Sequence, residues 1–317
     1  MANKNKIKSE SDVLPTGGSA KIKHIILSPS DKVFYTIVYT VTTLSALLVL
    51  YPLIYILSAS FSSGEAVTMG KVVLWPVDLS VDGYIKVFRY PDVFVGYRNT
   101  IFYTLAGTAI NVFMTLICAY PLARKGLPHK GIIMFLFTFT MMFGGGLIPT
   151  YLLVNSLGMV NTPFAMLIPG ALAVYQMIIT RTFIQNTIPD ELLESVKIDG
   201  CNDFRFFTQF VVPLSQAVIA VIALQYAVGH WNTYFSAMIY LSSKSLYPLQ
   251  IFLRQILVMS QFDTQDLFDQ ETASAIQGMK DLMKYALIVV STAPILCVYP
   301  FLQKYFVRGI MIGSLKG

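Results

Sequence analysis

Long apolar runs separated by short polar segments dominate the pattern of the 317-residue chain. A helix needs about 20 residues to cross a hydrocarbon core of about 30 Å, and it satisfies its backbone hydrogen bonds within its own segment. The runs are continuous rather than alternating with a period of two, which disfavours a β-barrel. The pattern therefore predicts an all-α integral membrane protein with six transmembrane helices, near residues 33–58, 98–122, 131–154, 163–184, 212–241 and 284–304.

Composition and charge agree with a membrane protein. Hydrophobic residues make up 55% of the chain, charged residues make up 13%, and the mean hydropathy is +0.62. In a typical soluble domain, about a quarter of the residues are charged. The net charge is +6, but the basic residues are scattered around the predicted spans instead of forming one patch, so we expect no nucleic-acid partner.

The polar segments also predict an orientation. With both termini in the cytoplasm, fifteen of the 23 Lys and Arg residues fall in predicted inner segments, as the positive-inside rule requires. Residues 1–32 are polar and rich in Lys and Ser, which predicts a flexible cytoplasmic tail. This leader and the first apolar run, 33–58, are both longer than those of a signal peptide, so the run is expected to stay as the first transmembrane helix.

Two segments are expected on the extracellular side. Residues 59–96 form a loop that carries the aromatic residues Trp75, Tyr84 and Tyr90. A second segment, 242–283, can begin with an amphipathic helix, because apolar residues recur at the helical spacing i, i+3, i+4 and i+7. These apolar residues are Leu249, Phe252, Leu253 and Ile256.

Glycine and proline interrupt the third predicted span. Gly144, Gly145, Gly146 and Pro149 lie at membrane depth, where a helix unwinds only if protein or water satisfies the freed backbone groups. They indicate either a packing kink or a hinge or gate beside a translocation path. The two halves of the chain share no repeat, which disfavours a self-contained secondary transporter.

The chain lacks the sequence motifs of an enzyme. Its histidines, His24, His129 and His230, are isolated, and HExxH, GxSxG and CxxC motifs do not occur. The nearest approach to a phosphate-binding loop, GEAVTMGKV at 64–72, has five residues between its glycines instead of four and no Ser or Thr after Lys71. We expect no enzyme activity, metal or cofactor on this chain, so pumping would need ATP bound by another chain.

Neutral polar and aromatic residues lie within the fifth predicted span. Gln225 and Asn232 are two helical turns apart and share one face, with Gly229 between them. Their amides fit hydrogen bonds between packed helices. They also fit a lining for a hydroxyl-rich solute, together with the rings of Trp231 and Tyr234, and both interpretations stay open.

A polar stretch between the fourth and fifth spans has the signals of two short helices. Thr187 stands three residues before Asp190, as in a capping box, and Gly200 supplies a left-handed stop. A second helix is expected from Asn202 to Pro213, where the next span starts. The first helix has a short apolar stripe, formed by Leu192, Leu193 and Val196.

This pair of helices has more than one interpretation. It could lie on lipid headgroups, or it could dock its apolar ridge and charged rim into a groove of a soluble partner. A DNA-reading helix-turn-helix is disfavoured, because the stretch is tethered to the membrane at both ends.

The spacing within the stretch resembles the EAA loop of permeases from binding-protein-dependent ABC importers. That loop reads EAA, three residues, Gly, nine residues, then I-x-L-P. Both spacings match, at Glu194, Ser195, Val196, Gly200, Phe210, Val212 and Pro213. Ser and Val replace the two alanines, and Phe and Val replace Ile and Leu, which keeps helical and apolar character.

Further segments extend the resemblance. Residues 142–170, 231–241 and 306–317 are similar to the maltose-permease-like, carbohydrate-uptake branch, especially to permeases for complex oligosaccharides in Gram-positive bacteria. The resemblance implies a type I importer permease core over 97–305, with the coupling loop at 187–213. It also implies that the first span is peripheral to this core and that residues 306–317 are a cytoplasmic tail.

The resemblance also implies an assembly in the bacterial cell membrane. A second homologous permease subunit would complete a heterodimer, two ATPase subunits would carry ATP and Mg²⁺, and an extracellular solute-binding lipoprotein would deliver the sugar. Coupling to the ATPase would fall on Glu194, Ser195, Val196, Lys197, Asp199, Gly200 and Pro213. The alternatives are an ABC permease for another solute, such as a peptide or phosphonate, and a membrane scaffold or sensor that transports nothing.

Overall fold

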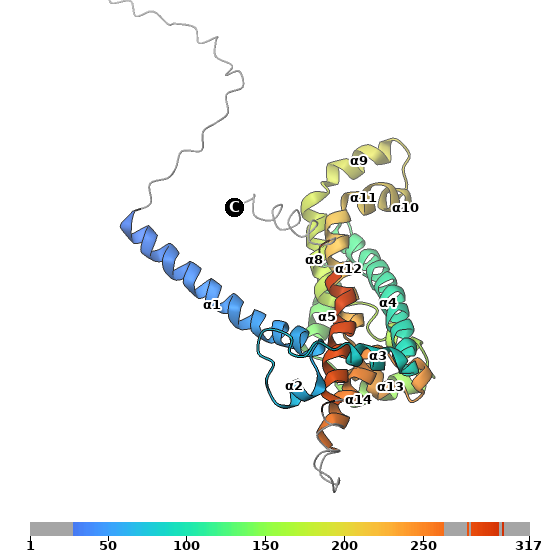
Figure 1. The fold of residues 1–317 in the computed structure, drawn as a ribbon. Helices are drawn as coiled ribbons and strands as arrows, with labels where there is room; N and C mark the ends of the chain where they lie inside the picture. The colour runs from blue at the N-terminus through green and yellow to red at the C-terminus, as the bar shows by residue number, and fades with distance from the viewer. Residues whose placement is uncertain (1–27, 263–277, 279, 298–299, 301–317) are drawn as a thin grey trace, which may run out of the picture. The chain divides into compact units, whose positions relative to one another are not determined.

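The computed structural model describes residues 28–262, 278, 280–297 and 300. All regular secondary structure in these residues is helical, as predicted (Figure 1). The chain divides into two compact parts, residues 1–51 and 52–317. The expectations for residues 1–27, for the end of the last span and for the tail 306–317 lie outside the described residues.

The first part contains most of helix α1 (Pro29–Ser60). The backbone N–H of Ser28 donates to Asp31 Oδ2 at 3.1 Å, which satisfies a donor at the start of the helix. The helix has 32 residues, and its most apolar 18-residue window has a mean hydropathy of 2.0 with none of the window buried. This confirms a first helix that is long and apolar enough to cross a membrane.

The second part contains the other helices. They are α2 (Gly64–Thr68), α3 (Asp82–Arg89), α4 (Pro91–Ala123), α5 (Lys130–Met142), α6 (Leu147–Ser156), α7 (Phe164–Leu167), α8 (Val174–Thr187), α9 (Asp190–Ile198), α10 (Asp203–Phe206), the π-helix η1 (Phe207–Val211), α11 (Val212–Leu214), α12 (Gln216–Trp231), α13 (Phe235–Tyr240), the 3₁₀ helix η2 (Lys244–Leu246) and α14 (Leu249–Phe262). Residues 280–297 are also helical.

Helix α4 is the centre of the second part, and it packs against α8 and α12. Half of its buried residues recur every four positions and form a stripe that winds slowly around the helix: Asn99, Tyr103, Gly107, Asn111, Thr115 and Ala119. Gly107 is needed for the close approach of α12, because a Cβ at this position would lie 2.4 Å from His230 Nε2.

The predicted span 163–184 is not one helix. It consists of α7 and α8, separated by the non-helical residues 168–173. Side chains from α4 and α12 satisfy the freed backbone, since Asn111 Nδ2 donates to Gly170 O at 2.5 Å and Tyr226 OH accepts from Ala173 N–H at 3.2 Å. His230 Nε2 lies 2.6 Å from Asn111 Oδ1 and holds that amide in place. Irregular backbone at membrane depth requires such partners.

The glycine-rich interruption of span 131–154 is a full break. Helices α5 and α6 are together long and apolar enough for one membrane span, but their axes meet at an angle of 112°. Gly146 caps α6 with φ 86°, a conformation that favours glycine, and Pro149 lies in the first turn, where its missing N–H costs nothing. The structure therefore has a sharp turn where the sequence predicted a kink, a hinge or a gate.

The predicted span 212–241 is also divided. The segment Asp203–Leu214 meets α12 at 78°, and α12 ends at Trp231 before α13 begins. The π-helix η1 directly precedes α11, which contains Pro213, a residue without a backbone N–H to donate. Among the described residues, two helices are long and apolar enough to span a membrane, or up to four if each bent pair is one span.

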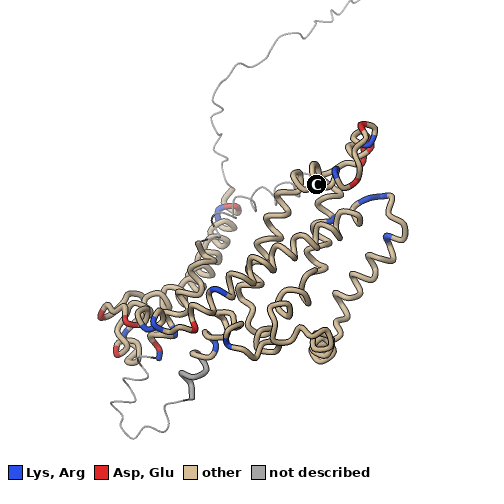
Figure 2. Tube along the Cα trace, turned by 90° about the vertical axis from the view of Figure 1, so that its right-hand side faces the viewer, with Lys and Arg blue, Asp and Glu red and all other residues tan. Residues whose placement is uncertain are grey.

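The segment 59–96 is more ordered than a loop. It contains α2, α3 and the first turns of α4. Trp75 is 81% exposed, but Tyr84 is half-buried and its hydroxyl lies 2.8 Å from Ser60 Oγ. Among the described residues from 52 onward, charged residues gather toward the two ends of the helices, and the middle is almost free of them (Figure 2). This distribution fits a membrane-spanning core.

Candidate functional site

Helix α9 holds the residues that the sequence assigned to coupling, and its ends follow local rules. Acidic Asp190 and Glu191 lie in its first turn and Lys197 in its last, which suits the helix dipole. Gly200 has φ 78° and donates its N–H to Lys197 O at 3.0 Å, while Cys201 N–H donates to Val196 O at 3.2 Å. This is a Schellman motif, so the predicted left-handed stop at Gly200 is confirmed.

The second short helix also begins where the sequence predicted. Asn202 caps α10, because its side-chain Oδ1 accepts the N–H of Arg205 at 2.8 Å. The capping box predicted for Thr187 is wrong. Thr187 is the last residue of α8, and α9 has Pro189 at its N-cap without a side-chain hydrogen bond.

The residues of α9 that the sequence assigned to coupling lie mostly on its exposed side. Glu194, Ser195, Lys197, Asp199 and Gly200 are exposed. On the opposite side, half-buried apolar side chains pack against a core cluster that includes Phe206 of α10; they are Leu192, Leu193 and Val196. The apolar stripe therefore attaches α9 to the fold and leaves its charged side open.

Two exposed apolar side chains near α9 were missed in the sequence. Ile198 is 87% exposed and Phe204 is 76% exposed. The sequence did offer a signal for Ile198, because this residue lies outside the apolar stripe that packs α9 against the fold. Both side chains are therefore available for contact with another molecule.

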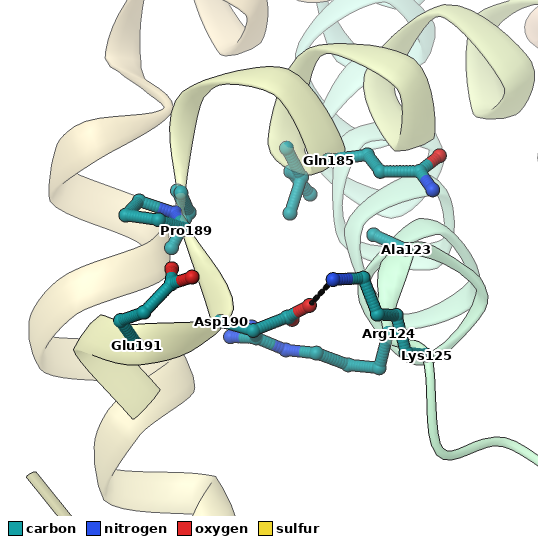
Figure 3. Close-up of a pocket in the computed structure, with 9 residues that line it drawn as sticks. Ala123, Arg124, Lys125, Gln185, Pro189, Asp190 and Glu191 are labelled. Carbon is teal, nitrogen blue, oxygen red and sulfur yellow. Dashed lines mark ion pairs between the residues drawn. The ribbon is translucent and has the colours of Figure 1, made fainter. Parts of the chain in front are cut away.

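An ion cluster joins α9 to the end of α4 (Figure 3). Asp190 Oδ2 lies 3.0 Å from Lys125 Nζ, and Asp190 Oδ1 lies 3.5 Å from Arg124 Nη1. The hydrogen bond from Lys125 lowers the pKa of Asp190, and the same bond raises the pKa of Lys125. A cavity of about 150 Å³ adjoins the cluster, and it is also lined by Ile184 and Gln185 of α8.

Arg124 connects three elements at this end of the fold. Its guanidinium carbon lies 5.0 Å from the ring centre of Tyr120 in α4 and 4.8 Å from that of Phe206 in α10. The side chain is only 13% exposed. The sequence could not predict this contact, because Arg124 and its partners Asp190 and Phe206 are far apart along the chain.

Further basic side chains complete the end of α4. Arg181 Nε donates to Leu122 O at 2.9 Å, and Lys130 Nζ donates to Arg124 O at 3.0 Å. These carbonyls are free at a helix C-terminus, where cations are favourable. Burial, with the nearby charge of Arg181, lowers the pKa of Lys130. The end of α4 that contacts α9 is therefore rich in basic side chains, and a groove of about 690 Å³ lies between α9 and the α4–α5 turn.

The candidates for a substrate path lie on and beyond α12. Gln225, Gly229 and Asn232 are exposed along one side, and Gln225 Oε1 accepts from Gln176 Nε2 at 3.4 Å. Tyr234 is 43% exposed. Trp231 is only 8% exposed and its indole N–H donates to Ser291 O at 2.9 Å, so its ring packs inside the fold and not on this exposed side.

Known proteins are similar to this chain in sequence or in fold. The chain is 40% identical over 287 residues to the polygalacturonan/rhamnogalacturonan transport system permease protein YtcP of Bacillus subtilis (strain 168), covering 90% of this chain and 99% of the relative. It is 40% identical over 267 residues to protein LplC of the same organism, with 84% and 89% covered. A search of protein-family models finds no match.

A solved structure agrees with these relatives. It is the crystal structure of a bacterial ABC transporter involved in the import of the acidic polysaccharide alginate. One of its chains is 33% identical, with a TM-score of 0.80, and the match covers 89% of this chain and 100% of that chain.

An all-helical core with this fold defines a membrane transport subunit. The chain belongs to the family of permease components of ABC sugar and polysaccharide transport systems.

Proposed function

We propose that this chain is the permease subunit of an ATP-driven importer for oligosaccharides, and that α9 is the helix through which partner ATPases move it. One observation carries the proposal: α9 is a short, exposed helix that is fixed to α4 through Asp190, with Glu194, Gly200 and Pro213 at the spacing of a coupling loop. Oligosaccharide cargo is supported by one relative, YtcP, whose name refers to polygalacturonan and rhamnogalacturonan.

The proposed topology has six membrane crossings and both termini in the cytoplasm of a Gram-positive bacterium. The basic cluster of Arg124, Lys125 and Lys130 supports it, because it lies at the same end of the fold as α9 and the positive-inside rule places such clusters in the cytoplasm. Trp75 and the α2–α3 segment then lie outside.

The proposed assembly has two permease subunits, two ATPase subunits that hold ATP and Mg²⁺, and an extracellular binding lipoprotein. Closure of the ATPases would push the α9 helices of both permeases together. Because Arg124 and Asp190 tie α9 to α4, this push would rotate the helical core as a rigid body from inward-facing to outward-facing.

The proposed sugar path follows the exposed side of α12. Amides such as Gln225 and Asn232 donate and accept hydrogen bonds, which suits sugar hydroxyls. Tyr234 offers a ring for stacking, whereas Trp231 would act by supporting the helix from inside. Gly144, Gly145, Gly146 and Pro149 remain the proposed gate, since the space beside each of the three glycines is open.

Two substitutions in the coupling loop test the proposal. Glu194→Ala removes the exposed charge, and Gly200→Pro is incompatible with φ 78°. Both are expected to abolish uptake and to reduce co-purification of the ATPase. Glu65→Ala, at another exposed glutamate, is the control. Unchanged uptake in both variants would refute the assignment of α9 to coupling.

The alternatives differ in cargo or in activity. A permease for peptides or phosphonates would show ATP hydrolysis stimulated by those solutes in the reconstituted complex, and not by sugars. A scaffold or sensor would show no solute uptake even with its ATPase and binding protein present.

A further inference from the structure

An exposed guanidinium lies over an aromatic ring beside the proposed path. The Arg254 guanidinium carbon is 5.4 Å from the ring centre of Tyr234, and Arg254 Nη1 also contacts the sulfur of Met238. Arg254 and Tyr234 are both exposed, with Tyr234 43% exposed. The ring and the Met238 sulfur lie against part of the guanidinium, and because Arg254 is exposed, its remaining N–H groups can donate to a ligand.

The packing of α14 fixes the direction of Arg254. Leu249 and Phe252 are 0% and 1% exposed, and Leu249 N–H donates to Thr100 Oγ1 of α4 at 2.9 Å. Successive helical residues are rotated by about 100°. Arg254, two positions after Phe252, therefore lies on the side of α14 that faces away from α4.

The positive charge of Arg254 is not neutralised by the described residues. The segment 232–262 contains Lys244 and Arg254 but no Asp or Glu. No carboxylate of the residues that the structure describes forms an ion pair with Arg254. An anion that reaches this place would meet a free guanidinium edge, which binds a carboxylate through two parallel hydrogen bonds.

The pair also continues the proposed sugar path. Tyr234 follows Asn232, which ends the exposed side of α12 that includes Gln225 and Gly229. Amide groups, an aromatic ring and a guanidinium thus follow one another at this end of the helix. The amides suit hydroxyls, the ring suits the face of a sugar, and the guanidinium suits a carboxylate.

We propose that Arg254 and Tyr234 form a subsite for the carboxylate of a uronic acid, and that the transported oligosaccharide is acidic. This inference rests on the proposed function, because it needs a sugar to pass along α12. Arg254 binds the carboxylate and Tyr234 orients the guanidinium and stacks on the ring that carries the acid.

The test compares one sugar with and without its charge. Uptake of trigalacturonate and of its fully methyl-esterified form is measured in cells that hold the complete transporter, for the wild type, Arg254→Gln, Arg254→Lys and the control Arg89→Gln, which alters an exposed arginine on α3. Dividing acid uptake by ester uptake for each variant, and then by the wild-type ratio, cancels the preference of the binding protein.

Arg254→Gln should lower this ratio about tenfold to a hundredfold, the scale of a hydrogen bond to a charged group. Arg254→Lys should restore part of it, since lysine keeps the charge but not the fork, and Arg89→Gln should leave it unchanged. An equal loss for acid and ester in Arg254→Gln would overturn the inference and indicate contact with the binding protein or a structural role. A wild type that imports a neutral oligosaccharide but neither galacturonate form would also overturn it, whereas no import of any saccharide would refute the proposed function itself.

Discussion

Arg124 offers the sharpest test of how α9 is held. Its guanidinium contacts two rings and one carboxylate, from α4, α10 and α9. Each cation–π contact contributes about 0.5–2 kcal/mol, and the partly exposed ion pair with Asp190 contributes about 1 kcal/mol. Tyr120 belongs to α4, as Arg124 itself does, so only the Phe206 contact and the Asp190 pair hold the α9–α10 segment. Arg124→Gln should therefore weaken the attachment of α9 by about 2 kcal/mol, which corresponds to roughly a thirtyfold change in the equilibrium between attached and open segment.

The assay is amide hydrogen exchange of residues 190–198 in the purified protein, together with uptake per ATP hydrolysed in the assembled transporter. Exchange should rise by roughly thirtyfold, because local opening controls it, and uptake per ATP should fall. Arg124→Lys keeps the charge but loses the planar stacking, so it should lie between wild type and Arg124→Gln.

Arg205→Gln is the matched control for this experiment. Arg205 is exposed on α10, and its Nε donates to Gln209 Oε1 at 3.1 Å, so the same substitution there removes a charge but no link to α9. If Arg124→Gln and Arg205→Gln exchange alike in 190–198, the attachment of α9 through Arg124 is refuted.

Three further predictions follow from the packing and charges. The ion pairs of Asp190 lower its pKa from 3.8, so they stabilise the protein fully above pH 3.8, and this stability is lost as the pH falls through the lowered pKa. The unfolding midpoint of Asp190→Asn should therefore fall less than that of the wild type on acidification, and an equal fall in both proteins would contradict the pairing. Gly107→Ala places a Cβ against His230 and should lower stability by about 1–3 kcal/mol in thermal unfolding, whereas Gly126→Ala, with open space beside it, should not. Asn111→Ala should cost about 1–3 kcal/mol, because it leaves Gly170 O and His230 without their partner, and an unchanged melting temperature would refute that role.

Local features of the fold could be predicted from the sequence. Gly200 acts through its own backbone and Asn202 through its side chain on the N–H of Arg205, so both signals are local, and the stop of α9 and the start of α10 were predicted correctly. Thr187 misled because α8 continues to Thr187, held by the buried residues Ile184 and Ile188. Tertiary packing there determined the helix end more strongly than the capping pattern.

Contacts between distant residues could not be predicted from hydropathy. The non-helical residues 168–173 are stable in an apolar region only because Asn111 and Tyr226 supply hydrogen bonds from other helices. Hydropathy alone therefore predicted one continuous helix near residues 163–184. The link between Asp190 and Arg124 was missed for the same reason, although Glu194, Gly200 and the break at Gly146 were all singled out.

Photo-crosslinking from α9 tests the central claim most directly. A photoreactive residue at Ile198, which is 87% exposed, should capture the ATPase subunit in membranes that hold the assembled transporter. The same residue at Leu79, which is 80% exposed at the opposite end of the fold, should not capture it. An intact complex in which Ile198 captures no ATPase, or in which Leu79 captures it as well, would contradict coupling through α9.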